Sequence, residues 1–565
     1  MKSDLEIARE ARLEPIQDVA ARFGLAAESL ELYGPYKAKV DHRLARSLAD
    51  RPRGRYIAVT AITPTPLGEG KTVTTIGLGL GLNRIGKKAI ITLRQPSMGP
   101  VFGIKGGAAG GGLSQVLPME DFNLHLTGDM HAVGAAHNLL AAWADTSVLL
   151  KNPFDLNPER VSIRRVVDIN DRALRQIEIG LGGPKNGVPR RTGFDITPAS
   201  EVMAILGLSR DFGDLRQRLG RMIVGEDSQG RPVTAETLEC AGAMCAILKK
   251  AVDPTVMQTT EGTLAFVHAG PFANIAYGNS SVLADLIAVR LADYTVTESG
   301  FGADMGFEKL CSIKSRASGL TPDVAVVVAT VRALKAHSGR FKVRPGKPLA
   351  EEMLVRDLES LELGMSNLVQ QIANVRAHGV PVVCALNRFE TDHPDEIELV
   401  LEKARAAGAA EAAVSDVHAR GGEGGEELAH AVDRVAEAGR AAFQPLYDLE
   451  LPLEEKIRVL ARTIYGADDI DLAEKARESL SRIEDWGFGG LPICMAKTHL
   501  SLSHDPKLKG APKNYVFPVR DVRLSAGAGF VYPLAGDMML MPGLGSRPAL
   551  RGIDVDADGN IEGLF

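Results

Sequence analysis

The chain has 565 residues, a net charge of −6 and 45% hydrophobic residues. This length exceeds what one hydrophobic core accommodates, so two to four domains are expected. The near balance of 65 basic and 71 acidic residues, without a basic block, argues against nucleic acid as a partner. Five scattered cysteines without CxxC spacing, a charged N-terminus and the lack of any run of 18 apolar residues predict a reduced, cytoplasmic protein that does not cross a membrane.

Short apolar runs separated by helical segments predict the fold. Strands without polar alternation are buried on both faces, as in a mostly parallel sheet covered by helices. The runs are residues 56–62, 89–93, 264–267, 294–297, 324–329 and 380–386. We therefore expect an α/β protein with a P-loop NTPase-like, mostly parallel sheet.

Two stretches break this rhythm of strands and helices. Turn-rich sequence in residues 141–249 predicts an inserted α+β domain. A helical pattern after Pro445 opens a C-terminal α+β domain, residues 441–565, which ends in a β segment rich in Gly and Pro. Residues 1–140 and 250–440 would then form the nucleotide-binding domain.

A loop with the composition of a phosphate-binding site follows the first predicted strand. It reads Thr65, Pro66, Leu67, Gly68, Glu69, Gly70, Lys71, Thr72, and an apolar-periodic helix comes next. A loop between a strand and a helix directs main-chain amides and a helix N-terminus at one anion. The lysine of such a loop reaches the terminal phosphates and the threonine holds Mg²⁺, so ATP and Mg²⁺ are the expected ligands. Thr65 departs from the usual pattern, which has glycine there.

Side chains at the ends of neighbouring strands extend this site. Glu298 and Asp304 follow one strand and are candidate metal ligands, with a surface turn as the alternative for Asp304. Arg94 ends the second strand, at the edge where parallel strands gather around a ligand. Its planar guanidinium suits a small carboxylate or an acyl phosphate, with a structural salt bridge as the alternative. His125 and Asp129 come later in the chain, near the next junction of strand and helix. Either residue could transfer protons or could hold the loop in place. Asn387 ends a later strand, where a nucleotide contact and a plain turn are equally consistent.

Together these motifs resemble those of the formate–tetrahydrofolate ligases, from about residue 33 to residue 565. Ordered segments along the whole chain carry the resemblance, among them TPTPLGEGKT, LRQPSMGPVFGIKGGAAGGG, NLHLTGDMHAV, GPFANIA, GFGADMGFEK, VATVRALKAH, GGEGGEELA and AKTHLSLSHDPKL.

The resemblance implies a reaction in two steps. Formate attacks the γ-phosphate of ATP, and N10 of tetrahydrofolate then takes the formyl group from formyl phosphate. On this basis Lys71 and Thr72 hold ATP and Mg²⁺, Arg94 binds formate and the acyl phosphate, and His125 and His268 match histidines of the family's site motifs. The resemblance also implies a monovalent cation (K⁺ or NH₄⁺), a homo-oligomer (tetramer or dimer), and substrate contacts from Tyr33, Gln95, Phe301, Phe389 and His418.

The acceptor side departs from the family pattern. Gln95 stands where an acidic residue is usual, Glu390 where proline is usual and His418 where tryptophan is usual. The pterin ring is expected between Phe389 and the residue at 418, and such stacking is worth roughly 1–3 kcal/mol per ring. Further departures are Tyr277, His499 and Leu500.

Two hypotheses for the function stay open at this point. The first is a formate–tetrahydrofolate ligase that tolerates these substitutions. The second is a paralogue that keeps the acyl-phosphate chemistry but uses a different amine acceptor or another small carboxylate. A non-catalytic regulator is disfavoured, because Lys71, Thr72 and Arg94 occur together.

Overall fold

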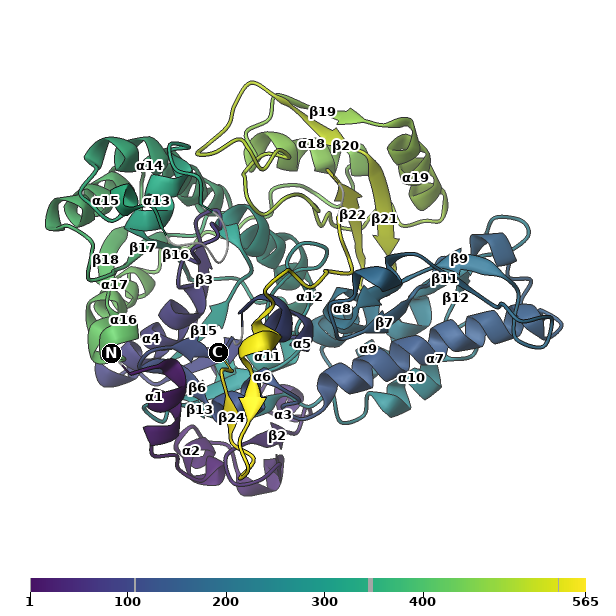
Figure 1. Ribbon diagram of the computed structural model, residues 1–565, viewed down its shortest axis with the longest axis horizontal. Coiled ribbons are helices and arrows are strands. Elements are labelled where there is room, and N and C mark those ends of the chain that lie inside the picture. The colour runs from purple at the N-terminus through teal and green to yellow at the C-terminus, as the bar shows by residue number, and fades with distance from the viewer. Residues whose placement is uncertain (1, 106–107, 344–348, 537, 565) are drawn as a thin grey trace.

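One large sheet forms the centre of the molecule (Figure 1). The computed structural model describes residues 2–105, 108–343, 349–536 and 538–564. The strand order is β1-β2-β13-β14-β4-β15-β3-β16-β17-β18; β6 also pairs with β13, and β5 pairs with β6. Neighbours from β14 to β18 in this order are parallel, whereas β13 pairs antiparallel with β14, β2 and β6. The predicted α/β class with a mostly parallel sheet is confirmed.

The parallel strands of the large sheet include six that agree with the predicted runs to within two residues at each end, and β18, which was not predicted. They are β3 (Arg55–Ala61), β4 (Ala89–Leu93), β14 (Leu264–Val267), β15 (Tyr294–Glu298), β16 (Val324–Ala329), β17 (Val382–Asn387) and β18 (Glu411–Ser415). The antiparallel strands at the other end of the sheet are β1 (Leu30–Leu32), β2 (Ala38–Val40), β5 (Gly110–Gly111), β6 (Ser114–Leu117) and β13 (Thr255–Thr259).

Burial on both faces explains why these runs are apolar without alternation. In β16, Val324, Val326 and Val328 belong to one core cluster and Ala325, Val327 and Ala329 to another. Successive side chains of a strand point to opposite faces, so both faces of β16 are covered. On one face lie α4 (Lys71–Arg84) and α17 (Glu426–Glu437), and on the other lie α13 (Val331–His337), α14 (Leu358–Ala377) and α15 (Pro394–Ala406).

The turn-rich stretch forms a unit beside the sheet. Helix α7 (Asp129–Leu149) runs from the sheet into this unit, so the predicted boundary at residue 141 falls within a helix. The unit also contains α8 (Glu201–Leu208), α9 (Phe212–Arg221), α10 (Ala241–Ile247), and the strand pairs β7 (Arg165–Val167) with β10 (Phe194–Ile196), β8 (Ile177–Ile179) with β9 (Arg190–Thr192), and β11 (Ile223–Glu226) with β12 (Pro232–Thr234).

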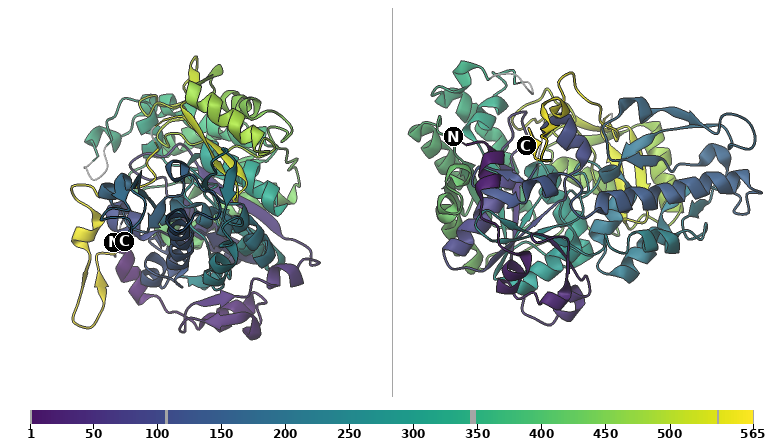
Figure 2. Two further views of the ribbon diagram at one scale, coloured as in Figure 1. Left: turned by 90° about the vertical axis from the view of Figure 1, so that its right-hand side faces the viewer. Right: turned by 60° about the horizontal axis from the view of Figure 1, so that its bottom comes forward.

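The C-terminal unit has its own core, formed by two helices and four strands. These are α18 (Leu453–Thr463), β19 (Asp469–Leu472), α19 (Glu474–Asp485), β20 (Val516–Val519), β21 (Asp521–Ser525) and β22 (Phe530–Leu534). The chain then returns along the central unit to a small hairpin of β23 (Asp554–Val555) and β24 (Ile561–Glu562), drawn in yellow in Figures 1 and 2. There Arg9 of α1 (Asp4–Glu10) donates a hydrogen bond to the carbonyl oxygen of Ile561 at 2.6 Å.

The remaining helices connect these elements. They include α2 (Ile16–Arg22), α3 (Leu44–Ser47), α5 (Met98–Pro100), α6 (Met119–Asn123), α11 (Val282–Leu291), α12 (Ser315–Ser318) and α16 (Val417–Arg420). Among the described residues, no helix is both long and apolar enough to span a bilayer.

Candidate active site

The loop of residues 62–70 joins β3 to α4 and is closed by its own side chains. The carboxylate oxygen Oε1 of Glu69 accepts hydrogen bonds from Thr65 N at 2.6 Å and from Thr65 Oγ1 at 3.0 Å. Gly68 and Gly70 have φ of +74° and +73°, a region that favours glycine. A Cβ at residue 70 would also collide with Asn387, whose Nδ2 donates to the carbonyl oxygen of Glu69 at 3.3 Å. This close approach explains the glycine and brings the end of β17 against the loop.

Glu298, at the end of β15, is the centre of the charged site. Its carboxylate forms an ion pair with Lys71, the first residue of α4, and accepts a hydrogen bond from Thr72 Oγ1 at 3.0 Å. Arg94, which follows β4, places a guanidinium nitrogen 3.5 Å from Glu298 Oε1. Strands β3, β4 and β15 are neighbours in the sheet, so their carboxyl ends bring Arg94, Lys71 and Glu298 together.

The charges around Glu298 keep it ionised. Burial opposes ionisation of the carboxyl group, but the positive charges of Lys71 and Arg94 outweigh burial. Together with the hydrogen bonds from Lys71 and Thr72, they hold the pKa of Glu298 at about 2. Two cations share one carboxylate, so these three side chains carry a net charge of +1 and suit a further anion.

The loop after β4 fixes the position of Arg94 through contacts from the inserted unit. Arg94 donates to the carbonyl oxygen of Pro271 at 3.3 Å, and its Nε is buried without a hydrogen-bond partner among the described residues. Two residues of the inserted unit hold the following segment: Asp168 accepts from Ser97 Oγ at 2.5 Å, and Asn170 donates to the carbonyl oxygen of Gly99 at 2.8 Å. Arg94 is thus held by a guanidinium hydrogen bond, and its Nε is a donor without a partner within the described chain.

Gln95 is the most unusual polar residue beside Arg94. It is only 2% exposed, and neither its amide oxygen nor its amide nitrogen has a hydrogen-bond partner within the described chain. A buried amide without partners costs free energy, which a ligand's polar group would recover. This observation favours a ligand contact for Gln95.

His268 is buried between two segments of the protein. It is fully buried, its Nδ1 lies 2.7 Å from Ser281 Oγ and its Nε2 lies 2.7 Å from the carbonyl oxygen of Ala251. Burial lowers the pKa of His268 to about 4, and the charge of Lys39 adds to this effect. Both ring nitrogens therefore have protein partners, and the lowered pKa favours the neutral imidazole.

Asp304 also differs from its expected surroundings. Its carboxylate forms a buried ion pair with Lys497 of the C-terminal unit, with Oδ2 2.8 Å from Nζ, and accepts from Gln371 Nε2 at 2.6 Å. Both oxygens are engaged by the protein. Of the predicted metal ligands, the structure brings only Thr72 and Glu298 together.

The predicted acceptor residues fall into separate local groups. The guanidinium of Arg332 lies 3.5 Å from the ring centroid of Phe389, and Phe301 stacks on His499 with centroids 5.5 Å apart. His418 is about half exposed, and its Nε2 is 3.9 Å from Asp4 Oδ1. No ring contact joins Phe389 to His418 among the residues that the structure describes.

Tyr33 and His125 are placed by other parts of the central unit. Tyr33 follows β1, the outermost strand of the sheet, where burial first and Glu31 second raise its pKa. His125 is an exposed residue on the turn between α6 and α7. Burial raises the pKa of Asp168, and nearby His125 opposes this effect.

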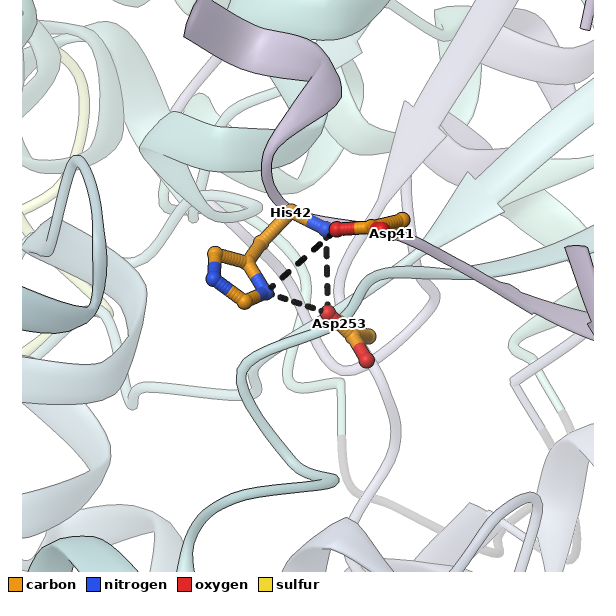
Figure 3. Close-up of side chains that lie close together, drawn as sticks. All are labelled: Asp41, His42 and Asp253. Carbon is orange, nitrogen blue, oxygen red and sulfur yellow. Dashed lines mark hydrogen bonds and ion pairs between the residues drawn. The ribbon is translucent and has the colours of Figure 1, made fainter. Parts of the chain in front are cut away.

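A second polar cluster is formed by Asp41, His42 and Asp253 (Figure 3). Asp253 Oδ1 accepts from His42 N at 2.9 Å and lies 2.7 Å from His42 Nδ1. Asp41 accepts from the backbone nitrogen and the guanidinium of Arg43. Because these carboxylates already have protein donors, the cluster ties the turn after β2 to the start of β13.

Some residues near the site were not expected from the sequence. Arg332, Lys497 and Lys39 contact predicted residues, the last through a buried ion pair of Lys39 Nζ with Asp129 at 2.7 Å. Arg332 and Lys497 lie in motifs that carry the family resemblance, and this was the signal that could have found them. Their partners are 57 to 193 residues away in sequence. The spacing of residues within a motif cannot predict contacts over such separations.

Comparison with known proteins gives the family. The model of the family described as formate–tetrahydrofolate ligase matches residues 2–565. The chain belongs to the formate–tetrahydrofolate ligase family. It is 59% identical over 564 residues to the formate–tetrahydrofolate ligase of Roseiflexus sp. (strain RS-1), with all of both chains covered. It is 57% identical to the enzymes of that name from Chloroflexus aggregans, over all of both chains, and Desulforamulus reducens, over all of this chain and 99% of the relative.

Proposed function

We propose that the site around Lys71, Arg94 and Glu298 joins formate to tetrahydrofolate at the expense of ATP, a reaction of one-carbon metabolism. Family membership over the whole chain supports the ligase activity. The single structural observation that carries the assignment of the site is Glu298, whose carboxylate is shared by the loop lysine and by Arg94. Two cations that follow β3 and β4, on either side of the carboxyl end of β15, suit the binding of a triphosphate next to a carboxylate.

Lys71, Thr72 and the backbone amides at the N-terminus of α4 are the proposed ATP contacts. Within the loop, the amides of Thr65, Leu67 and Gly68 already donate to loop oxygens. The loop precedes a helix, and a helix N-terminus with free amides favours phosphate. Lys71, released from Glu298 by an incoming phosphate, would balance the charge that develops on the γ-phosphate. Asn387 and Glu69 hold the loop in shape for this contact.

Thr72 and Glu298 are the proposed magnesium ligands. Their oxygens lie 3.0 Å apart, and hard oxygen donors of this kind are what Mg²⁺ prefers. The ion, when bound, neutralises phosphate charge. We leave Asp304 out of this set because Lys497 and Gln371 engage it.

Arg94 is the proposed formate-binding residue. Its guanidinium would orient formate so that one oxygen attacks the γ-phosphorus, forming formyl phosphate and ADP. N10 of tetrahydrofolate then attacks the carbonyl carbon, the bond from carbon to the bridging oxygen breaks, and phosphate leaves. Phosphate is a far better leaving group than hydroxide, which is why the carboxylate needs this activation.

The acceptor site is proposed to include Gln95, Phe301 and Phe389. Gln95 offers a donor and an acceptor that lack partners within the described chain. Arg332 covers one face of Phe389, so a pterin ring would stack on the other face. Full-length relatives at 57–59% identity carry the tetrahydrofolate name, and no observation favours a different acceptor. A monovalent cation and a tetramer or dimer stay predictions.

Oxygen transfer tests the proposed chemistry. Turnover with ¹⁸O-labelled formate, ATP and tetrahydrofolate should place one labelled oxygen in the inorganic phosphate, because the bridging oxygen of formyl phosphate comes from formate. Phosphate release should require both formate and tetrahydrofolate. Unlabelled phosphate would rule out the acyl phosphate, and labelled phosphate formed equally fast with another amine would rule out tetrahydrofolate as the preferred acceptor.

A further inference from the structure

A cavity of about 300 Å³ lies where the inserted unit, the central unit and the C-terminal unit meet. Figure 1 shows α8, α12 and the ends of β21 and β22 converging there. The lining from the central unit comes from α12 and the residues just before it. Helix α12 lies just before the start of β16. Glu298 is the last residue of β15, which runs in the same direction as β16, so it lies at the other edge of the sheet. The cavity is therefore at the edge of the sheet opposite to the loop of residues 65–72.

Three arginines line this cavity, and no acidic residue is among its lining residues in the described chain. Arg218 has protein partners, since it donates to Asp214 at 3.1 Å and to the carbonyl oxygen of Ala528 at 2.8 Å. Arg221 has no hydrogen bond or ion pair within the described part of the chain. Arg316 donates to the carbonyl oxygen of Tyr447 at 2.6 Å, but its Nε is buried and has no partner among the described residues. One whole guanidinium and part of a second are thus available.

The neighbouring groups are cations close to one another, with the carboxylates of Asp214 and Glu201 near Arg221 and those of Glu484, Glu450 and Asp448 near Lys456. Burial lowers the pKa of Arg221, and the charge of Arg218 lowers it further. Beside the cavity, Lys456 donates to the carbonyl oxygen of Leu491 at 3.1 Å. Burial first and the charge of Arg316 second lower the pKa of Lys456 to about 8. Cations that depress one another's pKa are stabilised by an added anion.

The rest of the wall is apolar. Leu208, Ile313, Leu449, Phe488 and Leu491 contribute hydrophobic surface next to the arginines. Ligand sites combine such apolar walls with a few polar groups that fix orientation, and their volumes begin near 300 Å³. Inorganic phosphate alone would leave this apolar surface unused.

We propose that the cavity binds a small organic anion in which a phosphate or carboxylate head is joined to one aryl ring or a short alkyl chain. The head contacts Arg221 and the free Nε of Arg316, and the apolar body packs on Phe488 and Leu491. A ligand in this position touches all three units of the chain. Its binding therefore raises the unfolding temperature as well as producing heat.

Phenyl phosphate is the probe for the test, with phenol and inorganic phosphate as partial probes. Calorimetry and thermal unfolding are carried out on the full chain saturated with Mg²⁺ and a non-hydrolysable ATP analogue, so that the probe does not report on the loop of residues 65–72. The wild type should bind phenyl phosphate saturably and roughly tenfold more tightly than either partial probe, because each lacks one class of contact.

Two variants distinguish this cavity from general attraction of anions. Arg221→Gln removes the free charge at an exposed position, and Leu449→Trp fills the apolar wall. Each should weaken binding of phenyl phosphate roughly tenfold. The matched control Arg440→Gln, at an exposed arginine after α17, should bind as the wild type does. Lack of binding by the wild type, unchanged affinity in Arg221→Gln, or phenol binding as tight as that of phenyl phosphate would each overturn the proposal.

Discussion

A Glu298→Gln substitution keeps the size of the side chain and removes the charge that Lys71 and Arg94 share. The pKa of Glu298 falls from the ordinary 4.5 to about 2 in the folded protein, and the side chain is 7% exposed. At 1.36 kcal/mol per pKa unit, a fall of about 2.5 units corresponds to roughly 3 kcal/mol of preference for the ionised carboxylate. The variant should therefore lose up to about 3 kcal/mol of stability at pH 7.

The pH dependence of this loss follows from the direction of the shift. A depressed pKa contributes stability above the unfolded pKa near 4.5, and the contribution disappears as the pH falls toward the folded pKa of about 2. Urea unfolding followed by circular dichroism measures the free energy of unfolding of both proteins. The difference between wild type and variant should become smaller as the pH falls through that range. Pyrophosphate should restore part of the lost stability at pH 7, because it supplies the missing negative charge.

Glu390→Gln is the matched control, since Glu390 is exposed. This variant should unfold at the urea concentration of the wild type at pH 7. Equal stability of Glu298→Gln and wild type at pH 7 would refute the charge arrangement. A deficit of the same size at pH 7 and near pH 2 would assign the loss to packing instead.

Arg94→Lys should leave ATP binding by calorimetry unchanged and lower turnover at least about tenfold, because an ammonium group cannot form the paired contact of a guanidinium; near-normal turnover would show that Arg94 does not bind formate. Gly70→Ala should lower the free energy of unfolding by about 1–2 kcal/mol or more, because φ is +73° and the added Cβ collides with Asn387, and an unchanged urea midpoint would contradict this reading. His42→Ala tests the pairing of His42 with Asp253 in Figure 3. The hydrogen bond to Asp253 raises the pKa of His42, and burial lowers it by less. The stability from that pair is complete below the ordinary pKa of 6.5 and is lost as the pH rises through the folded pKa, so the variant should be less stable than wild type by about 1 kcal/mol at pH 6 and by less at pH 9. A stability difference between wild type and variant that grows as the pH rises would contradict this assignment.

The parallel part of the sheet was predictable because its signal is local. Residues 324–329 are apolar at every position, and burial on two faces is the physical reason. The grouping of Lys71, Arg94 and Glu298 was also predictable, since parallel strands bring their carboxyl ends to one edge. The limits of the inserted unit were not, because α7 continues across residue 141 without a change of pattern.

Contacts between distant segments set the limit of prediction in the site. Asp304 resembles a metal ligand in its local sequence, but its partner Lys497 lies in another unit. His268 lies at the end of a strand as a catalytic residue would, yet Ser281 and Ala251 occupy both of its nitrogens. Such pairings depend on how whole units pack together, and no periodicity or motif in the sequence records them.

The return of the final segment to the first helix has a consequence for synthesis on the ribosome. Arg9 is made 552 residues before Ile561, which accepts its hydrogen bond. The ribosome releases a chain from its N-terminus onward, so the central sheet can assemble while this contact still lacks one partner. The surface next to α1 is therefore completed only when the segment that contains Ile561 has left the ribosome.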